Sequence, residues 1–220
     1  MSIKHHDFQA TRWLDELQDP FALFPIQSVG ESLDNLIADA DVEFAARQGP
    51  DGVARKFWDV PSELLHEEIG LLIGAAFVLG QATLTQTISI LNRLRQVVGP
   101  IGQLPLQRRE LLNSHTKQFT KAGFSHLVVI DLAANYFKHH HEWPDDRCSL
   151  QAKHSQSKTM EDCKRLGMAP GDSTSNLHSA LSAIGAYRSD VKQIQLCIQT
   201  WREQLADQLY CSLGIPNPAL

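Results

Sequence analysis

The chain has 220 residues, a formal charge of −5 at pH 7 and a sequence pI of about 6.0. Hydrophobic residues make up 43% and charged residues 20%, the composition of a globular domain that can bury a core without disulfides or a structural metal. The acidic balance excludes a global basic field for nucleic acid, so any such binding must use a local patch.

The cysteines and the first residues bear on the cellular compartment. Four cysteines are present, and they form neither a CxxC pair nor a zinc-finger spacing. The N-terminal residues are charged and contain no apolar signal-peptide core. We therefore expect free thiols and a cytoplasmic protein. The cysteines are Cys148, Cys163, Cys197 and Cys211.

The N-terminal part of the chain predicts two helices followed by a turn. An amphipathic helix is expected over residues 7–18 and a second over residues 32–47. Between them, residues 20–30 are expected to be extended because prolines and a glycine interrupt the pattern. Residues 49–52 predict a strong turn. We treat residues 1–58 as an N-terminal helical extension of the main bundle.

The bundle core, residues 59–220, is expected to begin with a long helix. Pro61 followed by acidic residues is typical of a helix start, and helical periodicity then continues to Val98, roughly 57 Å at about 1.5 Å per residue. Its most apolar run, Ile69 to Gly80, is too short to cross a bilayer, so we expect a helix surrounded by others and no membrane partner. Three glycines are expected either to allow close helix contact or to mark a bend. They are Gly70, Gly74 and Gly80.

The remainder of the chain predicts a series of shorter helices. The last of them is expected to be capped by Ser189 and to end at Gly214, with an apolar inner stripe. No alternating apolar run is long enough for a sheet, so we predict an all-α fold, a helical bundle with one long central helix. The other helices are expected over residues 105–121, 125–142, 159–167 and 173–185, and residues 145–156 are expected to be irregular. The stripe consists of Val191, Ile194, Ile198, Trp201, Leu205 and Leu209.

The helix expected over residues 125–142 carries a narrow polar stripe on an otherwise apolar surface. Five polar side chains fall at i, i+4, i+7, i+8 and i+11, which places them on one face. Burying such groups without partners would cost a few kcal/mol each, so the stripe either faces solvent at a cleft or its groups satisfy one another. The five residues are Asp131, Asn135, Lys138, His139 and Glu142.

The side chains of this stripe suit metal-independent cleavage of RNA. His139 can shuttle protons near neutral pH, and Lys138 can neutralise a phosphate or a developing anion. Asn135 can orient an imidazole or contact a backbone phosphate. We assign the catalytic roles to these three residues. Binding roles are assigned to Asp131, Glu142, His141, Arg108 and Arg109.

Two segments resemble the HEPN superfamily, which comprises helical-bundle proteins. The run from Asn135 to His139 (Asn-Tyr-Phe-Lys-His), near the end of an apolar helix, is similar to the signature region of that superfamily. The apolar stretch from Ile69 to Leu91 is similar to its long first helix, and the resemblance covers about residues 60–145 plus the C-terminal helix. It implies an RNA-binding or RNA-cleaving effector of toxin–antitoxin or phage-defence systems. It also implies a symmetric homodimer, with RNA or a cognate protein as the partner.

The sequence departs from the family motif at one position. That motif places an arginine four to six residues before the histidine. In this chain the positions four to six residues before His139 hold Asn135, Ala134 and Ala133. Lys138 would then have to supply the positive charge, unless Arg108 or Arg109 approaches in space.

Two other classes of function remain open. The missing arginine favours a non-catalytic helical module that binds a protein partner. A metal-dependent enzyme would use His139, His141 and Glu142 together with Glu63 and His66, which form one ExxH pair. Di-iron bundles need two such pairs and two further carboxylates, so the ligand count fails and we predict no metal and no cofactor. A solvated, His-rich helix end is the competing structural interpretation of residues 138–142.

Overall fold

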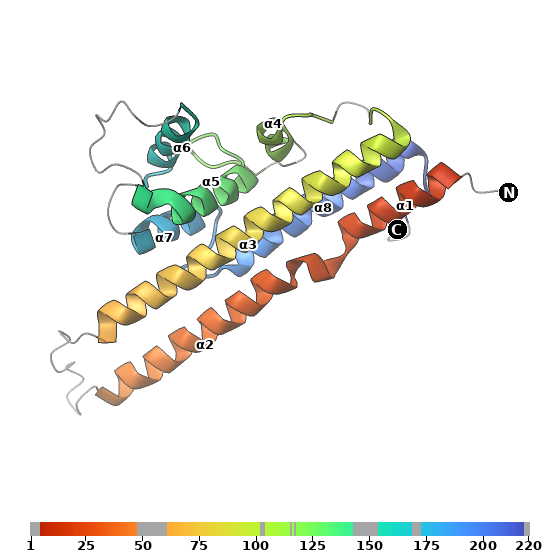
Figure 1. The fold of residues 1–220 in the computed structure, drawn as a ribbon. Helices are drawn as coiled ribbons and strands as arrows, with labels where there is room; N and C mark the ends of the chain where they lie inside the picture. The colour runs from red at the N-terminus through yellow and green to blue at the C-terminus, as the bar shows by residue number, and fades with distance from the viewer. Residues whose placement is uncertain are drawn as a thin grey trace.

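The fold, taken from a computed structural model, is an elongated bundle of helices (Figure 1). The structure describes residues 5–47, 61–101, 104–114, 116, 118–142, 154–168 and 173–217. Within these ranges the only pairing of extended residues is an isolated bridge between Phe119 and Ser125, so the predicted all-α class is confirmed. The helices are α1 (His5–Gln18), η1 (Pro20–Leu23), α2 (Phe24–Arg47), α3 (Pro61–Val98), α4 (Arg108–Asn113), α5 (His126–His139), η2 (His140–Glu142), α6 (His154–Arg165), α7 (Ser173–Ala183) and α8 (Lys192–Leu213).

The central element is α3, which has the bounds that the sequence predicts. It contacts α1, α2, α5, α7 and α8, and in Figure 1 it runs through the middle of the bundle with α8 behind it. By length and apolar composition alone, its segment Glu63–Val98 could also cross a membrane, although 44% of the tested window is buried inside the bundle. The core helix of a soluble bundle meets the same criterion.

Glycines on α3 allow the neighbouring helices to come close. A Cβ atom at Gly74 would overlap the ring of Phe137 from α5, and one at Gly70 would overlap a side chain of α7. At Gly80 a Cβ atom would lie 2.9 Å from Ile194 of α8, closer than side chains normally pack. Of the two roles predicted for these glycines, close helix contact is the one observed.

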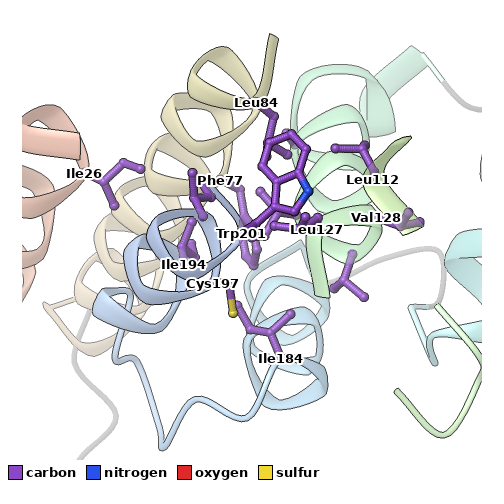
Figure 2. Close-up of a cluster of buried hydrophobic side chains, with 14 of the residues drawn as sticks. Ile26, Phe77, Leu84, Leu112, Leu127, Val128, Ile184, Ile194, Cys197 and Trp201 are labelled. Carbon is purple, nitrogen blue, oxygen red and sulfur yellow. The ribbon is translucent and has the colours of Figure 1, made fainter. Parts of the chain in front are cut away.

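The hydrophobic core centres on Trp201 of α8, which is 1% exposed and lies between Leu84 of α3 and Leu127 of α5 (Figure 2). The N-terminal helices contribute to the same core through residues such as Leu14 and Ile26. The whole inner stripe predicted for the last helix is buried. Its residues are Val191, Ile194, Ile198, Trp201, Leu205 and Leu209.

Residues 20–30 are helical, and the prediction of an extended segment is wrong. Pro20 opens η1 and Pro25 is the second residue of α2. A proline fits the first turn of a helix because its missing N–H would have no partner there. Asp19 caps η1 by accepting a backbone hydrogen bond at 3.0 Å. Gly30 lies buried within α2 against α8, so it serves close packing and does not break the helix.

The helix predicted over residues 105–121 is much shorter in the structure. Its helical part is α4, Arg108–Asn113, after which the Ser114 hydroxyl donates to a preceding backbone carbonyl at 2.7 Å. Further on, the backbone N–H of Thr120 donates to the carbonyl of Phe124 at 2.8 Å and closes a turn. A side chain that forms a hydrogen bond with nearby backbone, as Ser114 does, competes with continuation of the helix.

Two later helices begin at other residues than predicted. α6 starts at His154, earlier than the predicted start at Thr159. α8 starts at Lys192 rather than directly after Ser189, and its first N–H group donates to the carboxylate of Asp190 at 3.0 Å. A carboxylate that accepts from the first turn serves a helix start as well as a serine does.

Candidate functional site

The helix that carries the polar stripe, α5, is capped at its first turn and packed on its inner side. The hydroxyl of Ser125 accepts from the backbone N–H of Val128 at 3.2 Å and donates to the carbonyl of Leu112 at 2.7 Å. These two hydrogen bonds hold the start of α5 against α4. The residues from Leu127 to Ala134, apart from Asp131, are buried. The polar stripe therefore lies along the edge where α5 meets α3 and α4.

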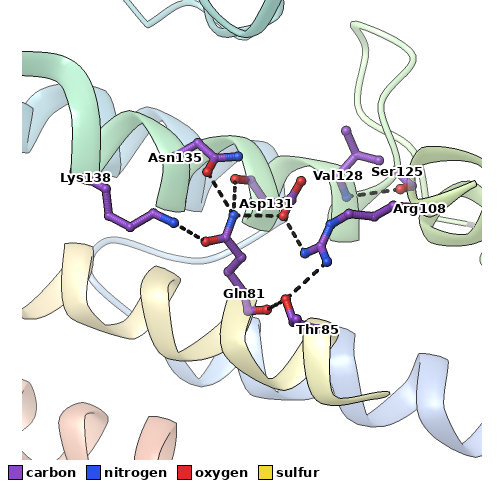
Figure 3. A network of polar contacts seen from close by, with 8 residues as sticks. All are labelled: Gln81, Thr85, Arg108, Ser125, Val128, Asp131, Asn135 and Lys138. Carbon is purple, nitrogen blue, oxygen red and sulfur yellow. Dashed lines mark hydrogen bonds and ion pairs between the residues drawn. The ribbon is translucent and has the colours of Figure 1, made fainter. Parts of the chain in front are cut away.

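One glutamine of α3, Gln81, joins three residues of the stripe (Figure 3). Its Nε2 donates to Oδ1 of Asp131 at 2.9 Å and to Oδ1 of Asn135 at 3.1 Å. Its Oε1 accepts from Nζ of Lys138 at 2.6 Å. The sequence left two arrangements open for the stripe: exposure to solvent at a cleft, or polar groups that satisfy one another. These three groups have polar partners within the protein, as in the second arrangement.

An arginine reaches the stripe from α4. Nη2 of Arg108 donates to Oδ1 of Asp131 at 2.7 Å, and its Nη1 donates to the hydroxyl of Thr85 on α3 at 3.1 Å (Figure 3). The two charged side chains are 36% and 20% exposed, so solvent weakens their attraction and the pair is worth about 1 kcal/mol or less. Of the two arginines considered for the missing motif position, Arg108 is the one that contacts the stripe, at Asp131. We call Gln81, Thr85, Arg108, Asp131, Asn135 and Lys138 the polar edge.

The second candidate arginine, Arg109, points to a different neighbour. Its Nη2 lies 3.0 Å from a carboxylate oxygen of Asp162 on α6, and its guanidinium lies 5.2 Å from the ring centre of Phe124. Arg165 approaches the same ring at 4.5 Å and the same carboxylate at 3.5 Å. Arg109 therefore ties α4 to α6 and lies outside the polar edge.

The stripe continues into histidines at the end of α5. His139 is the last residue of the helix, and both it and His141 are exposed. Lys138 is exposed as well, so a cation and two imidazoles share this end of the helix. The backbone of Glu142 lies in η2, and its side chain falls outside the part of the chain that the structure describes.

His140, between the two exposed histidines, has a structural position. Its ring stacks on Tyr136 with centroids 5.2 Å apart, and its Nδ1 lies 3.1 Å from the backbone oxygen of Phe137. The buried hydroxyl of Tyr136 in turn accepts from Nδ2 of Asn176 on α7 at 2.7 Å. These contacts fix the end of α5 against α7 and so position the histidines on either side.

The interpretation of the sequence missed Gln81 and Thr85. A signal for them was present, because polar residues interrupt the most apolar part of α3 from Gln81 onward. What the pattern cannot show is that these residues face α5 and not solvent.

The described residues include no group of three His, Cys, Asp or Glu side chains that could hold a metal ion. Glu63 and His66, the ExxH pair, are exposed on the first turns of α3. Among the described residues they do not combine with the exposed histidines into such a group.

A cysteine and a histidine meet on the inner side of α5. Sγ of Cys197 lies 3.6 Å from Nδ1 of His126. Burial raises the pKa of Cys197 to about 11 and lowers the pKa of His126 from its usual value. Both groups are therefore neutral at pH 7, whereas a nucleophilic cysteine needs a thiolate stabilised by a nearby positive charge. The two side chains therefore contribute to packing of the core and do not form a nucleophilic pair.

Comparisons of the chain with protein-family models, with curated proteins and with solved structures find no match. The resemblance to the HEPN superfamily therefore stays a prediction. The function has to be inferred from the contacts of the polar edge and of the histidines beside it.

Proposed function

We propose that the polar edge and the adjoining end of α5 bind RNA, and that the chain is a HEPN-like RNA-binding or metal-independent RNA-cleaving effector of the toxin or phage-defence type. The observation that supports this most is the position of Arg108. Its guanidinium joins Lys138 on one edge, which gives two cations against the single carboxylate of Asp131 among the described side chains. An excess of positive charge at a solvent-accessible edge suits a phosphate group.

Both cations keep donors for a ligand. An ammonium has three N–H bonds, and Lys138 uses one of them on Gln81. A guanidinium has five, and Arg108 uses two on Asp131 and Thr85. The internal bonds hold the cations in place, so less side-chain freedom would be lost when a phosphate binds.

In this proposal His139 performs the proton transfer. It would take the proton from a ribose 2′-hydroxyl, whose oxygen forms a bond to phosphorus while the bond from phosphorus to the 5′-oxygen breaks. The leaving oxygen takes up a proton, and no oxidant or metal is required. Lys138 and Arg108 would offset the charge on the phosphate oxygens, and Asn135 would orient the imidazole.

The test compares His139→Ala and Lys138→Ala with the wild type on single-stranded and double-stranded RNA in the presence of a chelator. We expect His139→Ala to lower cleavage by roughly 10²–10⁴-fold while binding is retained. We expect Lys138→Ala to weaken binding. Lys164→Ala, which removes an exposed cation of α6, is the matched control and should change neither.

Two results would contradict the proposal. One is that wild type and His139→Ala are indistinguishable in both binding and cleavage. The other is that His139→Ala unfolds the protein, since an exposed side chain should change stability by no more than about 0.5 kcal/mol.

The alternative function is a non-catalytic helical module that binds a protein partner. It is favoured by the fact that Asp131, Asn135 and Lys138 all bond to Gln81, as the members of a structural clamp would. Under this alternative no RNA is bound, and the polar edge serves only to hold α5 against α3 and α4. The free thiols of Cys163, Cys197 and Cys211 support a reducing compartment such as the cytoplasm under either function.

A further inference from the structure

Two exposed leucines lie on one side of α3 near its N-terminal end. Leu64 and Leu71 are 54% and 59% exposed, and because they are about two turns apart they lie on the same side of the helix. Gly80, whose backbone packs against Ile194 of α8, follows Leu71 by about two and a half turns. The side that carries the two leucines therefore faces away from α8.

α2 continues the same surface. It runs antiparallel beside α3 (Figure 1). Its Asp34 accepts a hydrogen bond from Nζ of Lys192 on α8 at 2.7 Å. Leu36 follows Asp34 by a little over half a turn, so it also lies on a side that faces away from α8, and it is only half-buried. Asp39, about one turn after Leu36, is exposed. Apolar side chains of both helices thus reach a surface that α8 does not cover.

The charged side chains of this surface are carboxylates. Glu67 and Glu68 lie between the two leucines of α3, and both are exposed. No lysine or arginine occurs at residues 31–42 or 63–92. The two glutamates and Asp39 form no ion pair with another residue that the structure describes. We call these carboxylates and the leucines beside them the acidic face, which consists of Leu36, Asp39, Leu64, Glu67, Glu68 and Leu71.

We propose that the acidic face is the docking surface for a basic amphipathic helix of another protein. Apolar residues about two turns apart on that helix match the spacing of Leu64 and Leu71, and lysines or arginines beside them pair with the carboxylates. The apolar contacts supply affinity, and the opposite charges orient the partner. This surface is separate from the polar edge, whose cations are Arg108 and Lys138, so the inference goes beyond RNA binding.

The chemistry of the acidic face favours this occupant over three others. RNA is a polyanion, which carboxylates repel. A second copy of this chain that docked through the same face would bring identical carboxylates together. Insertion into a lipid bilayer would remove Glu67 and Glu68 from water without a partner. A basic amphipathic helix removes the leucines from water and neutralises the carboxylates in the same contact.

The test measures the binding of two short fluorescein-labelled peptides to the full chain by fluorescence anisotropy, in the absence of RNA. One peptide consists of leucine and lysine, with the leucines on one side of a helix, and the other has glutamate in place of lysine. We expect the lysine peptide to bind more tightly by roughly ten-fold or more. Glu68→Lys and Leu71→Ser should each weaken its binding by roughly ten-fold, the first through charge repulsion and the second through loss of apolar contact.

Two changes at exposed positions of α8 are the matched controls. Glu203→Lys reverses an exposed carboxylate, and Leu196→Ser removes a leucine that is 53% exposed. Both variants should bind the lysine peptide as the wild type does. Circular dichroism should show the same helix content for the wild type and for all four variants.

Three results would overturn the proposal. One is that the two controls weaken binding as much as Glu68→Lys and Leu71→Ser do. Another is that the two peptides bind equally, or that neither binds. The third is that Leu71→Ser, but not Leu196→Ser, halves the mass of the chain in solution or abolishes its binding to phosphatidylcholine vesicles, because a second copy or a membrane would then cover the face. None of these results depends on RNA binding, which is assayed separately.

Discussion

The two sides of α5 are held in place by different physical means. On its inner side, Phe137 lies so close to Gly74 of α3 that a Cβ atom there would overlap its ring, and Ile130 would lie 3.0 Å from a Cβ atom at Gly80. On its outer side, the stripe is joined to α3 and α4 by hydrogen bonds of 2.6 to 3.1 Å through Gln81 and Arg108.

The difference determines how each side responds to change. Close-packed apolar surfaces cannot absorb an added methyl group without moving side chains or backbone. A half-exposed polar group that loses its partner can be hydrated instead, so the loss is small. The inner side therefore sets most of the stability of the α3–α5 contact, and the polar edge contributes less.

The largest effect is expected from Gly74→Val, which disrupts the packing of the inner side of α5 against α3. The new side chain would overlap the ring of Phe137, and we expect the free energy of unfolding to fall by about 3 kcal/mol. Urea denaturation followed by circular dichroism measures it. The matched control is Gln96→Val, an exposed position on the same helix, which should change stability by less than about 1 kcal/mol. Equal stability of Gly74→Val and wild type would show that the two helices are not in close contact.

An intermediate effect on the free energy of unfolding is expected at alkaline pH, from the buried thiol of Cys197 next to the inner side of α5. The pKa of Cys197 is about 11 in the folded chain against a usual value of 9.0, so folding favours the protonated thiol. Its contribution to stability is complete below pH 9 and is lost as pH rises toward 11, by about 2 kcal/mol. The unfolding free energy of wild type should therefore fall more steeply over this range than that of Cys197→Ser. Cys211→Ser, at an exposed thiol, should follow the wild type. Parallel curves for wild type and Cys197→Ser would mean that the thiol is solvated.

The smallest effect is expected at the polar edge. Gln81→Ala removes bonds to three half-exposed or exposed groups, and we expect a loss of about 1 kcal/mol. In a double-mutant cycle with Lys138→Ala, the coupling energy should be less than about 1 kcal/mol. Gln86→Ala, an exposed glutamine of the same helix, is the control and should be neutral. A loss at Gln81 as large as that of Gly74→Val would mean that both sides of α5 hold the contact equally.

Much of the fold could be predicted from local pattern. The bounds of α3, the start of α5 next to Ser125 and the inner stripe of α8 follow from proline position, helical periodicity and apolar spacing, all of which are short-range properties. The errors came where two local signals competed. Prolines interrupt residues 20–30 in sequence, yet they occupy first-turn positions where they are tolerated. The helix over residues 105–121 has helical periodicity, but side-chain bonds to backbone end it early.

The sequence by itself determined that this chain is an all-α bundle built around one long helix, and that α5 carries polar residues on a single face. Helical periodicity and helix caps depend on residues that are only a few positions apart, so they can be predicted from the amino-acid sequence alone. Only the tertiary structure decided that Gln81 binds three of those residues, and that Arg108 reaches Asp131 while Arg109 turns to Asp162. The partners of a polar side chain come from helices distant in sequence, and their approach depends on how the glycines of α3 let the helices pack.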